Sequence, residues 1–389
     1  TNKYSEGTPG RRYYGGQEFT DEIENYAIEL AKKMFGADHA NLQPHSGAPA
    51  NIAVYFAWCE PGDTILGMDL SHGGHLTHGH PVTYMSKLYN FVRYGISNVE
   101  TGEIDFNVVE ELCRKHKPKI LLVGFSAYPR ELDYSRFAEI GKKYNCLLMA
   151  DIAHIAGLIV PGLLKNPFDY GFNVVTSTTH KTLRGPRGGM ILSKGNVLNP
   201  LKSCDKVIEN IPTLIDRSVF PGFQGGPHMN TITAKAVAFE EAMTDDFAQY
   251  AKRVIEASKF LAEQLIKRGV KLVTNGTDNH LMLVDCLTSF GINGKLAEEV
   301  LDRVGLTVNK NSIPFDTLPP FTPSGIRLGT PAIISRNIAV SEMERIAEWI
   351  VEAIKSADSE VKLDEIARQV KEFSSKYILP SLKNDSMLE

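Results

Sequence analysis

The sequence predicts a two-domain α/β protein whose larger domain is built on a mainly parallel sheet. Short apolar runs alternate with helical patterns over the first half of the chain. Runs that are apolar on both faces, with helices between them, are typical of a parallel sheet covered on both sides. With 389 residues, the chain also exceeds the ~250–300 residues at which one hydrophobic core stops growing. We therefore expect a second, smaller domain.

The elements of the large domain follow from local patterns. A helix is expected over residues 19–36, because Ile23, Ala27, Leu30, Ala31 and Met34 recur at helical spacing and a glycine ends the pattern. Apolar runs predict strands over residues 63–68, 119–125, 146–153, 174–177 and 189–192, with helices over 108–115 and 137–144. In such sheets ligands bind beyond the carboxyl ends of the strands. Residues there are the first candidates for a functional site.

The pattern changes after Pro227. A long helical stretch over residues 231–269 leads to strand candidates at 271–274 and 280–286, and helical patterns follow at 295–304, 340–356 and 363–377. This order predicts a small α+β domain. We place the boundary inside the long helical stretch, which gives a large domain over residues 1–240 and a small one over 241–389. The segment 194–217 is interpreted as a surface insertion.

Composition argues against several classes of protein. Lys and Arg number 42 against 46 Asp and Glu, so the chain lacks the basic excess of a binder of nucleic acid or anionic membranes. The five cysteines are far apart and include no C-x-x-C pair, which favours a reduced, cytoplasmic protein. No apolar run reaches the ~18 residues that a membrane helix needs. We expect neither nucleic acid nor membrane as a partner.

An aspartate and a lysine stand out as candidates for chemistry. Asp151 follows four apolar residues, where a strand should end, and Lys181 follows a hydroxyl-rich loop after the next strand. A lysine in the crevice of such a sheet can have a lowered pKa and form a Schiff base. An aspartate nearby can keep a pyridinium nitrogen protonated, so the pair is consistent with pyridoxal phosphate chemistry. A helix-capping aspartate and a surface lysine remain the alternatives.

A run of histidines offers a different hypothesis. His72, His75, His78 and His80 lie close together in the sequence, and imidazoles are common zinc ligands. A zinc-dependent hydrolase is therefore the alternative from another class. No cysteine or glutamate nearby completes a ligand set, although Asp69 is available. We expect no metal.

Several motifs together resemble one family. Residues 177–189 (STTHKTLRGPRGG) resemble the cofactor-lysine signature of serine hydroxymethyltransferases, which are fold-type-I pyridoxal phosphate enzymes. The resemblance extends over residues 1 to about 331, in the family's order: 2–7 (NKYSEG), 12–16 (RYYGG), 43–47 (QPHSG), 73–79 (GGHLTHG), 151–154 (DIAH), 220–227 (FPGFQGGP), 308–311 (VNKN) and 324–331 (SGIRLGTP). The resemblance implies the reversible conversion of serine and tetrahydrofolate to glycine and 5,10-methylenetetrahydrofolate. It also implies a seven-stranded type of sheet in the large domain.

The resemblance assigns the cofactor site. Lys181 would hold pyridoxal 5′-phosphate as an internal aldimine, Asp151 would pair with its pyridinium nitrogen, and His75 would stack on its ring. The remaining cofactor-binding residues would be Ser126 and His154 beside the 3′ oxygen, and Ser46, Gly47, Ala48, Thr178, His180, Tyr4, Gly225 and Gly226 near the phosphate. Residues 46–48 precede a helix expected from about residue 50, whose amide groups suit an anion. Many relatives carry serine where this chain has Ala48.

The resemblance also assigns the substrates. Arg327 would bind the amino-acid carboxylate, Glu6 would move protons on the substrate hydroxyl and on folate, and Tyr14 would lie beside it. Arg187 would support the loop before Lys181. Positions matching the folate pocket are Leu70, Gly74, Leu76 and Asn311. A threonine-aldolase-type lyase, which needs no folate, is the closest alternative.

In the family, Tyr4 and the glycine pair reach the site of the neighbouring subunit. The resemblance therefore implies a homodimer or homotetramer with shared active sites. The family also carries a further N-terminal segment, which embraces the partner subunit and is absent here.

Overall fold

A computed structural model describes residues 3–195 and 210–380 of the chain. The large domain contains a seven-stranded sheet with the order β3-β9-β8-β7-β6-β4-β5. Its strands are β3 (His39–Asn41), β4 (Thr64–Met68), β5 (Asn90–Tyr94), β6 (Ile120–Gly124), β7 (Leu147–Asp151), β8 (Val174–Thr178) and β9 (Gly189–Ser193). Strands β5, β4, β6, β7 and β8 are parallel, whereas β9 and β3 pair antiparallel at one edge. The expected sheet is confirmed, with β3 and β5 as additional edge strands.

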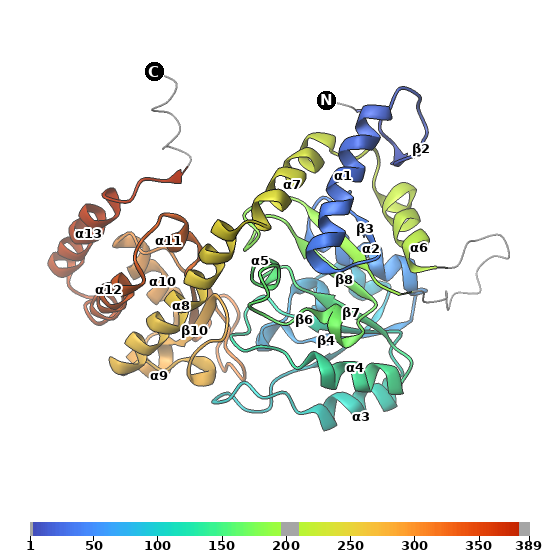
Figure 1. Cartoon of the computed structure of the whole chain (residues 1–389). Helices are drawn as coiled ribbons and strands as arrows, with labels where there is room; N and C mark the ends of the chain where they lie inside the picture. Colours follow the sequence, from blue (N-terminus) through green and yellow to red (C-terminus); the bar gives the residue numbers. More distant parts are fainter. Residues whose placement is uncertain (1–2, 196–209, 381–389) are drawn as a thin grey trace, which may run out of the picture.

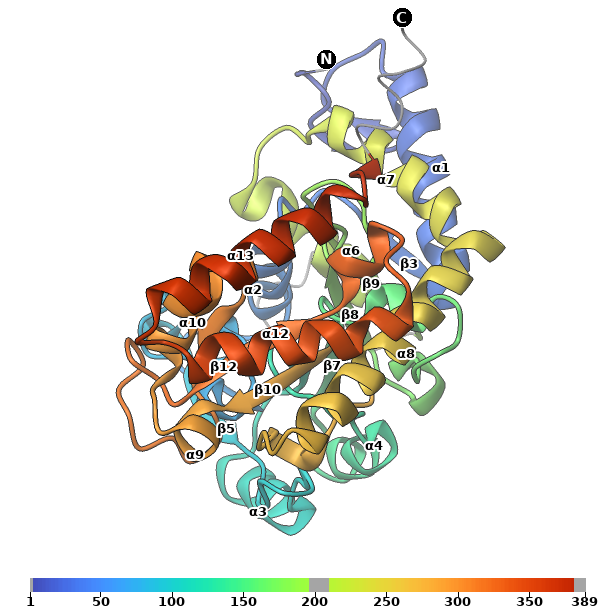
Figure 2. The same ribbon diagram turned by 90° about the vertical axis from the view of Figure 1, so that its left-hand side faces the viewer.

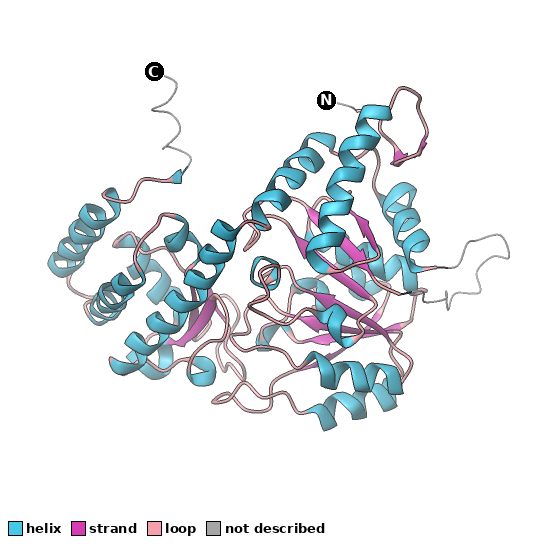
Figure 3. Cartoon of the chain, in the orientation of Figure 1, coloured by secondary structure: helices cyan, strands magenta, loops and turns pink. Residues whose placement is uncertain are grey.

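Both faces of this sheet are covered by helices (Figure 3). Alternate residues of the central strands face opposite ways: Ile120 and Leu122 belong to one apolar cluster, Leu121 and Val123 to another. One face packs against α2 (Gly47–Trp58) and α6 (Ile211–Arg217). The other is covered by α3 (Phe106–His116) and α4 (Tyr134–Lys143), with α1 (Glu18–Phe35) and α7 (Met229–Ala242) beside them. A short hairpin, β1 (Gly7–Thr8) with β2 (Arg11–Arg12), precedes α1.

The expected buried face of α1 is only partly correct. Ala27, Leu30 and Ala31 are buried, but Ile23 is 39% exposed and Met34 is half-buried. Glu24 is buried instead, because its carboxylate accepts hydrogen bonds from Arg12 and Gln43. The periodicity of apolar residues predicts which side of the helix is buried. It cannot predict that Glu24 is buried there as an ion pair with Arg12.

The small domain lies beside the large one, shown in orange and red in Figure 1. The expected single helical stretch is two helices, α7 and α8 (Asp245–Lys267), because Met243 leaves the helical ladder and the side chain of Thr244 caps α8. The small sheet is antiparallel, in the order β10-β12-β11, with β10 (Leu281–Asp285), β11 (Asn309–Asn311) and β12 (Gly325–Gly329). The strand expected at 271–274 is wrong: Leu272 forms only an isolated bridge with Val284, before a 3-10 turn.

The helices of the small domain agree with expectation to within a few residues. They are α10 (Gly294–Arg303), α12 (Met343–Lys355) and α13 (Glu360–Ser375), joined by the short α9 (Cys286–Phe290) and α11 (Pro331–Ser335). Figure 2 shows α12 and α13 on the outer face of the domain. The expected boundary at residue 240 falls in the last turn of α7. There α7 packs along α1, whereas α8 packs along α12 and α11.

The segment interpreted as a surface insertion is in part a buried helix. Residues 196–209 lie outside the described residues. The remainder forms α6, whose Ile211, Leu214 and Ile215 pack into the core beside α2. The carboxylate of Asp216 accepts a hydrogen bond from Asn41 at 2.8 Å and lies 3.0 Å from Nε2 of His39. The described end of this segment is therefore part of the large domain's core.

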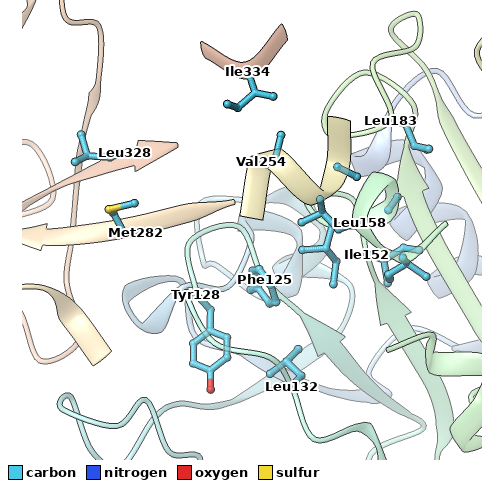
Figure 4. Packing of buried hydrophobic residues seen from close by; sticks show 14 of the residues in the cluster. Phe125, Tyr128, Leu132, Ile152, Leu158, Leu183, Val254, Met282, Leu328 and Ile334 are labelled. Carbon is cyan, nitrogen blue, oxygen red and sulfur yellow. The ribbon is translucent and has the colours of Figure 1, made fainter. Parts of the chain in front are cut away.

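One apolar cluster runs from the large sheet into the small domain (Figure 4). Phe125 and Tyr128 follow β6, Val254 lies on α8, and Met282 and Leu328 belong to the small sheet. Shared burial of this kind holds the two sheets in a fixed relation. Among the described residues, no helix has the length and apolar character needed to cross a membrane.

Candidate active site

A cavity of about 150 Å³ opens at the carboxyl ends of the parallel strands. Asp151 ends β7, and Thr178 ends the neighbouring β8. The cavity is lined by residues that the sequence analysis singled out: Ser46, Gly47, Ala48, His75, Ser126, Asp151, His154, Thr178, His180, Lys181 and Arg187. Phe125 and Ala153 complete it. The structure thus gathers, in one crevice, residues that lie as far apart in the sequence as Ser46 and Arg187.

The carboxylate of Asp151 is held from several sides. Its Oδ2 accepts a hydrogen bond from Nδ2 of Asn51 at 2.9 Å and lies 3.0 Å from Nε2 of His78. Its Oδ1 accepts the backbone N–H of Ala153 at 3.0 Å. Burying this carboxylate alone would be costly, and these donors compensate the loss of water.

The hydrogen-bond network sets the orientation of both donors. The backbone N–H of His75 donates to Nδ1 of His78 at 3.2 Å, so the proton of the neutral imidazole lies on Nε2 and is directed to Asp151. The hydroxyl of Thr176 donates to Oδ1 of Asn51 at 2.6 Å, which turns the amide nitrogen toward the carboxylate. Sequence reasoning missed Asn51 altogether and considered His78 only as a zinc ligand.

Asp151 is held as an anion. Burial by itself would raise its pKa, but the side-chain hydrogen bonds from His78 and Asn51 outweigh the burial and lower the pKa below the ordinary value of 3.8. The pKa of Lys181 is lowered, chiefly because its ammonium group is buried. The negative charge of Asp151 opposes this shift, whereas the positive charges of Arg327 and Arg187 add to it. A lysine with a lowered pKa beside a permanent anion is suited to nucleophilic amine chemistry.

The loop that carries Lys181 is closed by its own backbone. The N–H of Thr179 donates to the carbonyl of Gly188, and the N–H of Arg184, which has a left-handed φ of 57°, donates to the carbonyl of Lys181. The guanidinium of Arg184 lies 4.0 Å from the ring centroid of Tyr250 on α8. The turn after Lys181 is therefore anchored to the second helix of the α7–α8 pair.

The imidazoles around the cavity are neutral near pH 7. Burial lowers the pKa of His75 from 6.5 to about 4. Burial also lowers the pKa of His154, assisted by the positive charges of Lys181 and Arg327. The rings of His154 and His280 are nearly parallel, with centroids 5.8 Å apart. Sequence reasoning missed His280, which no motif spacing connects to the site.

One end of the cavity is suited to an anion. Helix α2 begins at Gly47, earlier than the expected residue 50, and its N-cap Ser46 makes no side-chain capping hydrogen bond. Exposed amide groups at a helix N-terminus bind phosphate and carboxylate groups. Gly47 must be small here, because a Cβ would lie 2.9 Å from Cγ2 of Thr178. His180 approaches from β8, with its Nδ1 accepting the N–H of Gly188 at 3.2 Å.

Arg327 lies at the adjoining mouth of the crevice. It projects from β12 of the small domain and donates to the carbonyl of Ser126 at 2.9 Å and to Oδ1 of Asn309 at 3.1 Å. A second, more open cavity is lined by Arg327, Asn309, His154 and His280. The guanidinium therefore joins the two domains beside the Lys181 crevice.

The remaining candidates form a separate group. Tyr4, Glu6, Tyr14, Gly225 and Gly226 do not line the Lys181 cavity. The rings of Tyr4 and Tyr14 are 5.1 Å apart, and a Cβ at Gly226 would lie 3.3 Å from Oε1 of Glu6. Oε2 of Glu6 is buried with no partner among the described residues. Within one chain, this group therefore lies apart from the Lys181 cavity.

The loops proposed for folate come together across the domains. Leu70, Gly74 and Leu76 follow β4, and Asn311 ends β11. The rings of His72 and Phe315 meet edge to face at 4.8 Å, which joins the loop after β4 to the loop after β11. Gly74 lies where a Cβ would be 2.1 Å from the carbonyl of Met68, so only glycine fits.

The histidine run does not form one cluster. Nδ1 of His72 accepts the N–H of Ile96 at 3.0 Å, and Nδ1 of His80 accepts the N–H of Val82 at 3.3 Å. In the part of the chain that the structure describes, the group with metal-ligand spacing is His75, His78 and Asp151. Its His78 already uses both ring nitrogens. The four histidines of the zinc alternative therefore do not form one ligand set in the described residues.

Comparison with known families identifies one family for this chain. The model of the family described as serine hydroxymethyltransferase matches residues 1–350. The match covers most of the chain, including both sheets and the residues of the crevice. The chain therefore belongs to the serine hydroxymethyltransferase family.

Proposed function

We propose that the Lys181 crevice is the active site at which this chain carries out the reaction of its family. The family interconverts serine and glycine, with pyridoxal phosphate as cofactor and tetrahydrofolate as cosubstrate. The observation that carries the assignment is the juxtaposition of an amine of lowered pKa with a buried, ionised carboxylate. The lowered pKa keeps the amine of Lys181 reactive, and the ionised carboxylate of Asp151 would hold a proton on the ring nitrogen of the cofactor.

The residues of the crevice fit pyridoxal phosphate. The amine of Lys181 would bind the aldehyde, Asp151 the pyridinium nitrogen, and the start of α2 with His180 the phosphate. Thr178 and Ala48 would line the phosphate end, where Ala48 offers its amide and no hydroxyl. When bound, the cofactor supplies an electron sink for bonds broken at the substrate's Cα.

The neutral imidazoles have separate roles. His75 would lie against the ring face, and its pKa of about 4 means that it adds no charge at neutral pH. His154 and Ser126 would lie beside the 3′ oxygen. Arg327 would bind the substrate carboxylate, since a guanidinium forms two parallel hydrogen bonds with it. Arg187, which also lines the cavity, would support the loop before Lys181.

We further propose that a second copy completes the site in a homodimer or homotetramer. The separate group of site residues would then act at the active site of the partner subunit: Glu6, Tyr14, Tyr4, Gly225 and Gly226. Glu6 would hold and release the protons of the substrate hydroxyl and of folate. Phe19 and Tyr26 on α1 are 69% and 51% exposed, and exposed apolar side chains in a row favour a protein contact. This arrangement explains why one chain keeps the two groups of site residues apart.

The folate-independent alternative, a threonine-aldolase-type lyase, fits less well. The contact between the rings of His72 and Phe315 joins the loop of Leu76 to the loop of Asn311. This contact supports a binding surface for tetrahydrofolate beside the crevice, which the lyase would not need. A zinc hydrolase is not favoured by any observation. We assign the catalytic crevice to a large domain over residues 1–240, with Arg327 and Asn311 contributed by a small domain over 241–389.

The cytoplasm is the proposed location. Cys59, Cys113, Cys146 and Cys286 are buried and free, and unpaired thiols are typical of reducing compartments.

The function is tested by visible absorption during sequential additions to the purified protein. Pyridoxal phosphate should give the band of a lysine-bound cofactor, glycine should alter it, and tetrahydrofolate should then produce a new long-wavelength band. Serine cleavage that requires folate would support the proposal. Equal cleavage without folate would favour the lyase, and no cofactor band would refute the assignment of Lys181.

A further inference from the structure

A lysine behind the phosphate end of the crevice forms no ion pair with the described residues. Lys235, on α7, is 1% exposed. Its Nζ donates to the carbonyls of Leu42 at 2.6 Å and of Gly189 at 2.7 Å. Within residues 3–195 and 210–380, no carboxylate oxygen lies within 4.0 Å of it. An ammonium group buried without an anion is costly, so a nearby anion would be strongly favoured.

The backbone joins this lysine to the phosphate end. Gly189, whose carbonyl it binds, lies so close to the start of α2 that a Cβ would be 2.3 Å from the carbonyl oxygen of Ser46. A Cβ on Gly188 would lie 2.3 Å from Cε of Lys235, and the N–H of Gly188 donates to His180. Lys235 is therefore one backbone layer behind Ser46 and His180, without touching the cavity.

Other basic side chains surround this lysine. His45, His228 and Arg187 line a small cavity together with Lys235, and the ring of His45 stacks on that of His228 with centroids 4.4 Å apart. Burial lowers the pKa of both His45 and His180, and the positive charge of Lys235 makes a smaller contribution in the same direction. Glu24 on α1 is the acidic group that acts on it electrostatically.

That acidic group is already engaged. The carboxylate of Glu24 accepts hydrogen bonds from Arg12 and Gln43. Burial accordingly lowers the pKa of Lys235 to about 7, with Glu24 opposing. The ammonium is thus poised to gain or lose its proton near neutral pH.

We propose that Lys235 is an electrostatic partner of the cofactor phosphate, acting through the backbone layer of Gly188 and Gly189. This rests on the proposed function, because it takes the anion at the start of α2 to be that phosphate. The phosphate stabilises the charged lysine, and by reciprocity the charged lysine strengthens phosphate binding. If Lys235 only held the carbonyl groups of Leu42 and Gly189, its role would be structural. Its replacement would then weaken the binding of pyridoxal phosphate and of pyridoxal equally.

The experiment compares pyridoxal phosphate with pyridoxal, which lacks the phosphate. Both are titrated into cofactor-free protein at pH 7, and bound cofactor is followed by absorption. In Lys235→Met, affinity for pyridoxal phosphate should fall about fivefold, as expected for coupling between sites, while affinity for pyridoxal stays within a factor of two of wild type. Lys252→Met, which changes an exposed lysine on α8, is the matched control.

The wild-type protein provides a test that needs no variant. Raising the pH from 7 to 9 removes the proton from Lys235 in the cofactor-free protein. The ratio of the two affinities should therefore fall about fivefold, and in Lys235→Gln it should stay constant. Equal loss of both ligands, or a wild-type ratio independent of pH, would overturn the proposal. Failure of wild type to bind either aldehyde would instead refute the proposed function.

Discussion

Nε2 of His78 lies 3.0 Å from Oδ2 of Asp151, across 73 residues of sequence. The same oxygen accepts the amide of Asn51. Because Nδ1 of His78 is occupied by the N–H of His75, its other nitrogen can only present a proton to the carboxylate. A buried carboxylate with two such donors remains ionised. Asp151 can therefore hold a proton on a ligand's ring nitrogen without taking it.

Replacing His78 should release this constraint. In His78→Asn the pKa of Asp151 should rise, because its largest hydrogen-bond contribution is removed. A hydrogen bond to a charged group contributes roughly 1.5–3 kcal/mol, so affinity for pyridoxal phosphate should fall about 10- to 100-fold. Spectrophotometric titration measures it. His80→Asn, which loses one contact to the N–H of Val82, should bind the cofactor normally; equal losses would mean that the whole loop has moved.

The sequence could predict the sheet but not all of its neighbours. Runs such as 119–125 are apolar on both faces, as in strands of a sheet that is covered on both sides, and such runs predict β4 and β6 to β9. The break between α7 and α8 was missed because Thr244 caps a helix in the middle of a continuous apolar pattern. Periodicity reports which residues face inward and gives no sign of a local cap.

The site was predictable where motifs carry it. Lys181, Asp151 and the start of α2 were found because strand ends and short loops are local features. His78, Asn51 and Lys235 could not be assigned, because each acts through a partner about 46 to 193 residues away. A residue type indicates which partners are possible, and only the fold selects one.

Lys181 should be the one residue covalently joined to the cofactor. Lys181→Ala should abolish the linkage that borohydride reduces, because no other amine lies in the cavity lining. Mass spectrometry after reduction measures it. Lys295→Ala, which changes an exposed lysine on α10, should keep the linkage. A reducible adduct that persists in Lys181→Ala would place the reactive amine elsewhere.

Glu6 should matter for proton movement and not for amino-acid binding. Its buried Oε2 has no partner in the described chain, as expected for a group that awaits a ligand. Glu6→Gln should reduce folate-dependent serine turnover about 100-fold or more, the usual contribution of a general acid–base group. Affinity for glycine, followed by absorption, should not change. If both fall together, Glu6 acts on structure and not on the proton.

Folding stability should weaken in mild acid through His75. Its pKa is lowered on folding from 6.5 to about 4, so the unfolded chain binds the proton more tightly and stability falls as the pH drops from 6.5 toward 4. Between pH 7 and pH 5 this one group should cost about 2 kcal/mol. Urea unfolding of the cofactor-free protein measures it. Between pH 7 and pH 5, the free energy of unfolding of His75→Phe should fall by about 2 kcal/mol less than that of wild type. A fall identical to that of wild type would contradict the lowered pKa of His75.

Mixing two inactive variants should restore activity if the site is shared between subunits. In a dimer of Lys181→Ala with Glu6→Gln, one site carries both substitutions, whereas the other combines the intact Lys181 of one chain with the intact Glu6 of its partner. Random exchange should then give about a quarter of wild-type activity. If both residues act within one chain, every site carries one substitution and mixing restores nothing. Because a single chain keeps Glu6 outside the Lys181 cavity, we expect recovery, measured as folate-dependent turnover after subunit exchange.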